Sequence, residues 1–155
     1  MNSLQEKLLG MLSWFDSFCR KNGLRYYVLG GTMLGTIRHN GFIPWDDDID
    51  VGLPRADYEK FCDMVSNQTY GDYVVETVHS ADPAYSYTYT KVFDTTTTLI
   101  ENLKEKLVRG IYLDIFPLDG IGDSEKDALR LYRNISIKLN FYSTRVCGIR
   151  KGRSW

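Results

Sequence analysis

The feature that most constrains the structure of this chain is a group of four aspartates within five consecutive positions. They belong to the segment Pro44-Trp45-Asp46-Asp47-Asp48-Ile49-Asp50-Val51. Carboxylates this close together repel one another and raise one another's pKa values, so the cluster is unfavourable by itself. If the segment is a strand, alternate side chains share a face, and Asp46, Asp48 and Asp50 point the same way. We therefore expect a strand with an apolar face in a core and an acidic face that is offered to a cation.

The chemistry of this acidic face favours Mg²⁺ or Mn²⁺, which take hard oxygen ligands. A calcium loop fits less well, because the segment lacks the central glycine and the terminal glutamate of an EF-hand. Most charge runs are solvated loops. Here, however, the acids lie between a Pro-Trp pair and an apolar alternation rather than in a polar linker. The segment therefore predicts a divalent-metal site.

A further carboxylate, Asp114, lies within the apolar run Ile111–Phe116, which we expect to be a strand stopped by Pro117. A lone aspartate in such a strand is unfavourable unless it is paired or ligated. Two interpretations remain open for it. It is either hydrogen-bonded to a neighbouring loop or the carboxylate that completes the metal site from an adjacent strand.

Phosphate-binding groups are predicted at a glycine pair and at three basic residues. Gly30 and Gly31 follow a short β-rich run and precede a helix, where backbone N–H groups can approach a phosphate. Glycine pairs often only form turns, and the segment matches neither a Walker loop nor the dinucleotide fingerprint. Arg38, His39 and Lys91 are candidates to meet donor phosphates, and a surface or structural role is equally open for each.

Hydrophobic periodicity predicts alternating helices and strands, and hence an α/β or α+β domain. The expected helices cover Ser3–Lys21, Thr32–Arg38 with Thr32 as its cap, Ala56–Val65, and a last segment that Ser124 caps. The expected strands cover Leu24–Leu29, Ile49–Leu53, Tyr73–Val78, Tyr87–Phe93 and Ile111–Phe116.

The composition of the chain limits the classes of binding partner and the cellular compartment that we expect. The net charge of −1 argues against a nucleic-acid partner, which needs a basic surface. Cys19, Cys62 and Cys147 have no zinc or redox spacing, which favours free thiols and a reducing cytoplasm. No signal-peptide core is visible, and no run approaches the ~18 apolar residues of a transmembrane segment. We expect a cytoplasmic protein, with peripheral contact to the inner membrane leaflet as an open alternative.

The order of these features resembles the LicD family, which includes phosphocholine transferases of bacterial cell-surface glycans and is related to fukutin-type ribitol-phosphate transferases. The residues that carry the resemblance are Gly30–Gly35, Arg38–Val51, Lys91–Asp94 and Leu113–Gly120. It implies a nucleotidyltransferase-like mixed sheet flanked by helices. It also implies transfer of a phospho-alcohol, such as phosphocholine from CDP-choline, to a sugar hydroxyl of a glycan such as lipopolysaccharide or teichoic acid.

The same resemblance implies roles for individual residues. Asp48 and Asp50 would bind the Mg²⁺ or Mn²⁺ ion, with Asp114 as the third carboxylate and Asp46 as an extra ligand. Gly30 and Gly31 would cradle the phosphates of the donor. Residues 1–142 would form the catalytic core, and residues 143–155 a basic tail or the start of a C-terminal region.

Metal-assisted phosphoryl transfer is the mechanism that this pattern favours, with Asp48, Asp50 and Asp114 as the catalytic carboxylates. Asp114 is also a candidate acceptor of the hydroxyl proton, because an apolar setting raises a carboxyl pKa. Two alternatives stay open. A true nucleotidyltransferase would use the same carboxylates but transfer a nucleoside monophosphate and release pyrophosphate. A catalytically silent binding domain would keep the fold without the reaction.

Overall fold

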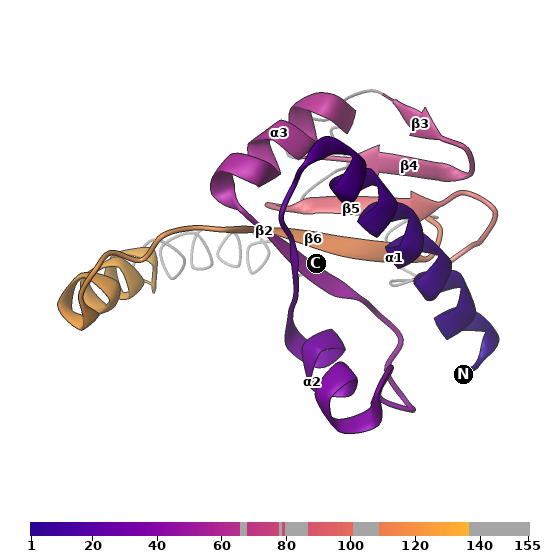
Figure 1. Cartoon of the computed structure of the whole chain (residues 1–155), viewed down its shortest axis with the longest axis horizontal. Helices are drawn as coiled ribbons and strands as arrows, with labels where there is room; N and C mark the ends of the chain where they lie inside the picture. Colours follow the sequence, from indigo (N-terminus) through magenta and orange to yellow (C-terminus); the bar gives the residue numbers. More distant parts are fainter. Residues whose placement is uncertain (66–67, 78, 80–86, 101–108, 137–155) are drawn as a thin grey trace, which may run out of the picture. The chain divides into compact units, whose positions relative to one another are not determined.

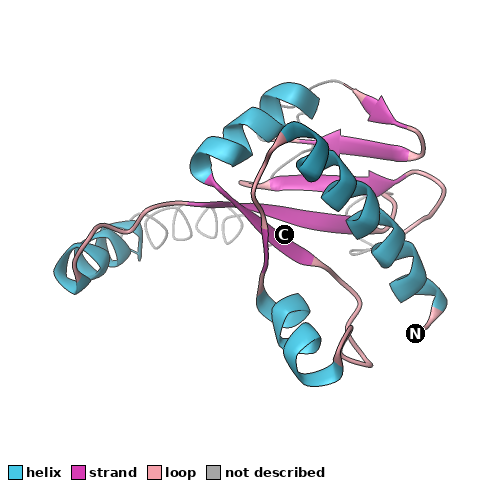
Figure 2. Ribbon diagram, in the orientation of Figure 1, coloured by secondary structure: helices cyan, strands magenta, loops and turns pink. Residues whose placement is uncertain are grey.

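The structure is a computed structural model that describes residues 1–65, 68–77, 79, 87–100 and 109–136. It divides into two compact units, Met1–Leu118 and Asp119–Trp155. The first unit is built on a six-stranded mixed sheet with helices packed against it (Figures 1 and 2). This architecture confirms the expected α/β class. The predicted tail, residues 143–155, lies outside the described residues.

The sheet has the strand order β1-β2-β6-β5-β4-β3. Its strands are β1 (Tyr27–Val28), β2 (Asp50–Pro54), β3 (Thr69–Tyr70), β4 (Tyr73–Glu76), β5 (Thr90–Asp94) and β6 (Tyr112–Leu118). β2 and β6 run parallel, whereas the other neighbouring strands are antiparallel. The parallel pair lies inside the sheet and joins segments about sixty residues apart in sequence. It therefore brings the acidic segment beside Asp114.

The described residues of the first unit contain three helices: α1 (Ser3–Asn22), α2 (Gly30–His39) and α3 (Arg55–Val65). α1 begins with a capping box, in which the Asn2 side chain accepts a hydrogen bond from the Gln5 N–H group and Gln5 Oε1 accepts one from the Asn2 N–H group. It ends at Gly23, whose φ of 65° is in the left-handed region that glycine adopts at low cost. None of the helices in the described part of the chain is long and apolar enough to cross a bilayer.

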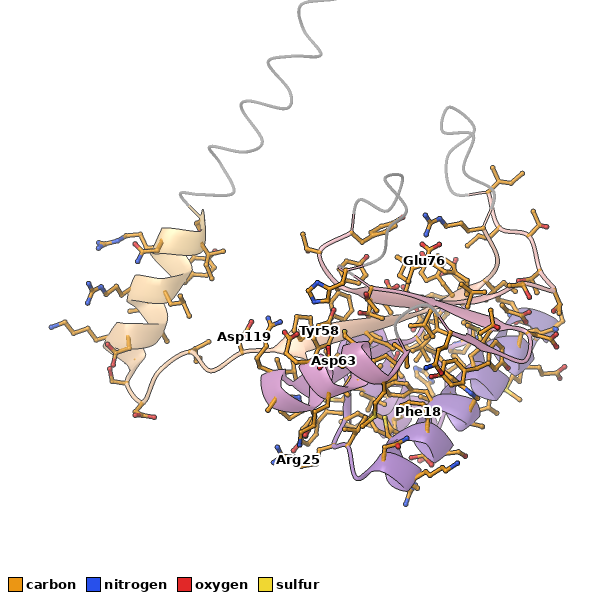
Figure 3. All side chains as sticks on the ribbon, turned by 90° about the horizontal axis from the view of Figure 1, so that it is seen from above. Phe18, Arg25, Tyr58, Asp63, Glu76 and Asp119 are labelled. Atoms are coloured by element: carbon orange, nitrogen blue, oxygen red, sulfur yellow. The ribbon has the colours of Figure 1, made fainter. Side chains whose placement is uncertain are left out.

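One face of the sheet packs against α1 and α3 and forms the core (Figure 1). The strands contribute alternate residues to it: Val51, Leu53, Val92, Leu113 and Ile115. Phe61 of α3 makes edge-on contacts with Phe15 and Phe18 of α1, with ring centroids 5.5 and 5.4 Å apart. The side chain of Phe18 is labelled in Figure 3. Because strand side chains alternate, the residues between these core positions point to the opposite face.

Among the element boundaries that differ from those expected, two concern the site. α2 begins at Gly30, with Leu29 as its N-cap residue, so the expectation that Thr32 caps this helix was wrong. Thr32 lies in the first turn instead, where its Oγ1 atom accepts a hydrogen bond from the Asp50 N–H group at 3.0 Å. β2 begins at Asp50, so residues 46–49 precede the strand rather than belong to it.

Pro117 does not stop the last strand, as we had expected, because β6 continues to Leu118. Proline lacks the N–H group of a sheet ladder and is tolerated where a strand has an open edge. β5 begins at Thr90, which pairs with Ile115, so beyond that point β6 has β2 as its one neighbour among the described strands. Pro117 therefore lies where a missing donor costs little.

The described part of the second unit, residues 119–136, contains a helix over residues 125–136. Ser124 caps it as predicted, since Ser124 Oγ accepts a hydrogen bond from the Asp127 N–H group at 3.2 Å. In the first unit, Cys19 and Cys62 are buried free thiols, which confirms the interpretation from their spacing. Cys147 lies outside the described residues.

Replacing Phe61 with alanine should lower the free energy of unfolding by about 3–5 kcal/mol, because Phe61 is completely buried between the two helices. Urea denaturation followed by circular dichroism measures this change. Met64→Ala on the same helix is the matched control, because 39% of the Met64 side chain is exposed, and its cost should stay below about 1 kcal/mol. Equal losses for the two variants would contradict this packing.

Candidate active site

Charged side chains form a row across the sheet face that is opposite the core. In the parallel pair Asp50 lies beside Asp114, and in the neighbouring antiparallel pair Asp114 lies beside Lys91. Asp114 is therefore the centre of a row that runs from β2 through β6 to β5. The structure thus brings together three residues that the sequence had marked in three separate segments.

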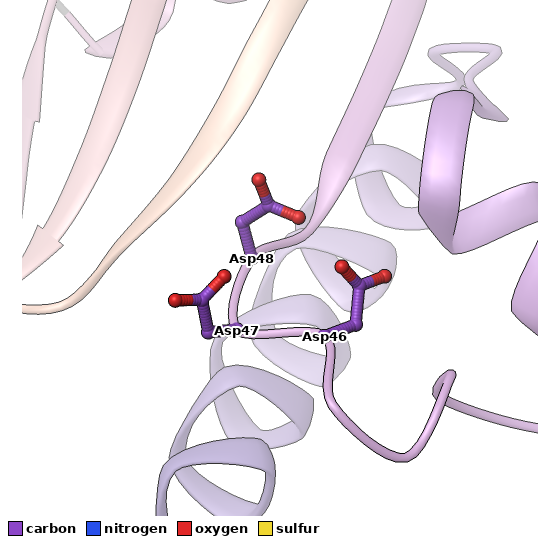
Figure 4. Close-up of side chains that lie close together, drawn as sticks. All are labelled: Asp46, Asp47 and Asp48. Carbon is purple, nitrogen blue, oxygen red and sulfur yellow. The ribbon is translucent and has the colours of Figure 1, made fainter.

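The acid loop, residues 43–49, leads into β2 and gathers the remaining carboxylates. Asp46, Asp47 and Asp48 each place one carboxylate oxygen so that the three lie within 4.8 Å of one another (Figure 4). Asp46 Oδ2 is buried and has no hydrogen-bond partner among the described residues. A buried carboxylate oxygen without a partner is costly, and a cation would remove that cost. The donor set therefore fits a hard divalent cation.

Asp47 is the member of this group that sequence reasoning missed. Strand alternation assigned Asp47 to the face away from Asp46 and Asp48, but that rule applies only to extended, paired backbone. Residues 46–49 are not in a strand, so three successive aspartates can bring their carboxylates close together (Figure 4). The turn at Pro44-Trp45 was the available signal that the strand begins later.

The first turn of α2 lies against two of these carboxylates. A methyl group at Gly30 would lie 2.8 Å from Asp50 Oδ2, and one at Gly31 would lie 2.8 Å from Asp46 Oδ2. Only glycine allows the acids to approach the helix this closely. The N-terminus of a helix carries a partial positive charge, which stabilises nearby carboxylates. The two glycines thus serve the acidic cluster, and their predicted contact with donor phosphates stays a prediction.

Lys91 provides the positive charge next to these acids. Only 2% of its side chain is exposed, and its Nζ atom lies 2.8 Å from Asp114 Oδ1. The same ammonium group lies over the rings of Tyr112, Tyr87 and Tyr89, at 3.3, 4.5 and 5.5 Å from their centroids. Aromatic faces attract a cation and replace part of its water shell. Lys91 is therefore held beside Asp114 rather than extended into solvent.

Burial and crowding perturb the acids of the row. Burial raises the pKa of Asp114 to about 6; Lys91 opposes this shift, and Asp50 and Asp48 add to it. The pKa of Asp48 is raised by burial first and then by the neighbouring aspartates. The pKa of Asp50 is raised by burial and by Asp46. Carboxyl groups with raised pKa values grouped in this way are typical of functional sites.

The two remaining candidates, Arg38 and His39, are exposed in the last turn of α2. A helix rises ~1.5 Å per residue, so these side chains start about 12 Å along the axis from Gly30. His39 has Trp45 as an aromatic neighbour, with ring centroids 6.5 Å apart. The structure does not group Arg38 and His39 with the acids, and their role toward phosphate stays a prediction.

The sequence model described as LicD/FKTN/FKRP, nucleotidyltransferase domain, matches residues 23–140 of this chain. The chain belongs to this family. The lipopolysaccharide cholinephosphotransferase LicD of Haemophilus influenzae is 36% identical over 136 residues, which are 87% of this chain and 51% of that protein. The human ribitol 5-phosphate transferase FKRP is 39% identical over 54 residues, which are 35% of this chain and 11% of that protein. The family predicted from the motifs is confirmed, and the chain spans about half the length of the bacterial relative.

The raised pKa of Asp114 predicts that the stability of the metal-free protein depends on pH. The pKa of Asp114 in the folded state, about 6, exceeds its value in the unfolded state. The stabilisation that protonated Asp114 gives to the folded state is therefore complete below about pH 4 and is lost as the pH rises through 6. Between about pH 4 and pH 7, the free energy of unfolding of wild type should fall by about 2–3 kcal/mol relative to that of Asp114→Asn. Urea denaturation in a chelator measures both proteins. If the difference in the free energy of unfolding between the two proteins does not change with pH, the raised pKa of Asp114 is contradicted.

Proposed function

We propose that this chain is the catalytic domain of a metal-dependent transferase that moves a phospho-alcohol from a CDP-linked donor to a sugar hydroxyl of a cell-surface glycan. The observation that supports it most is the convergence of the acid loop, Asp50 and Asp114 in a family whose relatives are named for phosphocholine and ribitol phosphate transfer. A CDP-choline-like donor and a lipopolysaccharide-like acceptor are the corresponding substrates. The buried thiols of Cys19 and Cys62, which form no disulfide, support a cytoplasmic location for this reaction.

The carboxylates of the site would hold Mg²⁺ or Mn²⁺. Asp46, Asp48 and Asp50 are the proposed ligands, with Asp114 completing the set. Asp47 is a further candidate, because one of its carboxylate oxygens lies within 4.8 Å of those of Asp46 and Asp48. A bound ion would supply neutralising charge to the donor's diphosphate. Lys91 lowers the negative charge of the acids and leaves them net anionic, as a site for a divalent cation requires.

Asp114 is the proposed acceptor of the proton from the attacking sugar hydroxyl. In the metal-free protein its pKa is about 6, so Asp114 is ionised near neutral pH and can accept a proton. The sugar oxygen would form a bond to the phosphorus that carries the alcohol. The bond from that phosphorus to the oxygen of CMP would break, so that CMP leaves with the electron pair. Lys91 holds the carboxylate of Asp114 in place during this step.

The alternative reaction is nucleotidyl transfer from a nucleoside triphosphate with release of pyrophosphate. The same carboxylates would serve both reactions, because each needs only a metal-held phosphate and an attacking oxygen. The names of the relatives favour phospho-alcohol transfer.

Phosphorus NMR of the protein with CDP-choline, Mg²⁺ and a crude glycan acceptor tests the proposal. We expect CMP to be released, and Asp48→Asn to slow that release at least about a hundredfold, because the variant loses a charged ligand of the ion. Asp63→Asn is the matched control. It removes one carboxylate from the exposed side of α3 (Figure 3) and should leave the rate unchanged.

The same assay with a nucleoside triphosphate in place of CDP-choline tests the alternative reaction. Pyrophosphate released from the triphosphate, with CDP-choline intact, would replace this proposal with nucleotidyl transfer. Equal rates of CMP release by wild type and Asp48→Asn would contradict the proposed role of the acid loop in the reaction.

A further inference from the structure

We propose that Gln5 of α1 is a positioning residue for the acid loop: its side-chain amide fixes the loop backbone and so determines where the aspartates present their carboxylates. Gln5 is only 3% exposed although it is polar. Its effect on the loop does not depend on any ligand. Its consequence for a bound cation rests on the proposed function.

The nitrogen of the Gln5 amide faces three backbone carbonyl groups of the loop. Nε2 lies 3.2 Å from the Ile43 oxygen, 3.4 Å from the Pro44 oxygen and 3.1 Å from the Asp46 oxygen. The two amide hydrogens are shared among these acceptors. Carbonyl groups removed from water need such partners. One side chain of α1 thus satisfies the backbone on both sides of Trp45, at the start of the acidic cluster.

The oxygen of the same amide is engaged elsewhere, which fixes the direction of the nitrogen. Gln5 Oε1 accepts a hydrogen bond from the Asn2 N–H group at 3.2 Å and completes the capping box of α1. A flipped amide would set Oε1 against three carbonyl oxygens and Nε2 against an N–H donor, and both arrangements are repulsive. Helix capping and loop positioning therefore require the same orientation of one side chain.

α2 restrains the start of the same loop. A methyl group at Gly35 would lie 2.5 Å from the Gly41 oxygen and 2.9 Å from the Ile43 nitrogen, so the loop backbone packs directly on the helix. The Gly41 N–H group also donates a hydrogen bond to the Gly35 oxygen at 3.4 Å. The Asp46 N–H group donates to the Ile43 oxygen at 3.0 Å, which closes a turn. While α2 packs against residues 41–43, Gln5 binds the loop backbone from Ile43 to Asp46.

The sequence alone gives Gln5 a smaller role. Asn2 and Gln5 have the spacing of a capping box, which accounts for both residues without reference to any other part of the chain. Gln5 also precedes the segment that the family model matches, residues 23–140. Only the tertiary structure shows that the amide reaches a loop thirty-eight to forty-one residues away.

A pair of variants separates the two roles. Gln5→Met keeps the length of the side chain but loses the contacts with the loop and the capping-box hydrogen bond that Gln5 Oε1 accepts. Asn2→Ala loses the other capping-box hydrogen bond, which the Asn2 side chain accepts, and leaves the loop contacts available. In metal-free protein, we expect amide hydrogen exchange at Asp46 to be about tenfold faster in Gln5→Met and to stay within about twofold of wild type in Asn2→Ala. Equal exchange rates in the two variants would overturn the proposal.

Mn²⁺ binding measured by calorimetry gives the second readout. We expect Gln5→Met to raise the Mn²⁺ dissociation constant about tenfold, and Asn2→Ala to change it less than twofold, although both lower the melting temperature. Unchanged affinity in Gln5→Met would overturn the link from the loop to the cation. A wild-type protein that binds no Mn²⁺ would instead contradict the proposed function, and the exchange data would still decide the role of Gln5.

A third variant covers the case in which Gln5→Met does not fold. Gln5→Glu keeps an oxygen to accept from the Asn2 N–H group but loses the donors to the three carbonyl groups. We expect fast exchange at Asp46 and a melting temperature below that of wild type, because the second carboxylate oxygen of the variant faces the three carbonyl groups. Wild-type exchange in this variant would overturn the proposal.

Discussion

The parallel pairing of β2 with β6 places Asp50 beside Asp114, and the repulsion between these carboxylates and those of the acid loop is the constraint on which the site depends. Three features offset it. Lys91 contributes a full positive charge, the first turn of α2 contributes partial positive charge, and glycine at the start of α2 lets the acids come close to it. The apolar face of the same strands supplies the burial that holds this arrangement together.

The tyrosines around Lys91 strengthen its effect on Asp114. Rings displace water from the ammonium group, and charges interact more strongly where water is excluded. They also occupy the space into which a long, flexible side chain would otherwise swing. The position of Lys91 is consequently set by strand register and by packing together. Lys91 therefore behaves as a fixed charge within the sheet.

Much of this fold was predictable, because the local patterns agree with the tertiary structure. The apolar alternation after Asp50 fixed the core face of β2, and a lone aspartate in an apolar run identified Asp114. The orientation of Asp46, Asp47 and Asp48 was not predictable in this way, since alternation has no meaning before the strand begins. Nor were the contacts of Gln5 and Thr32, because a capping pattern and a threonine in a helix do not indicate which distant backbone they will meet.

Under the proposed function, the raised pKa of Asp114 would couple metal binding at this cluster to the release of a proton. Burial favours the protonated carboxyl group, so near pH 6 a large fraction of the molecules holds a proton at the centre of the row. A cation that binds there must displace that proton into solvent. If the proposed ion uses Asp114, proton and metal ion compete for one carboxylate. The pH of the surroundings would then set the effective affinity for that ion.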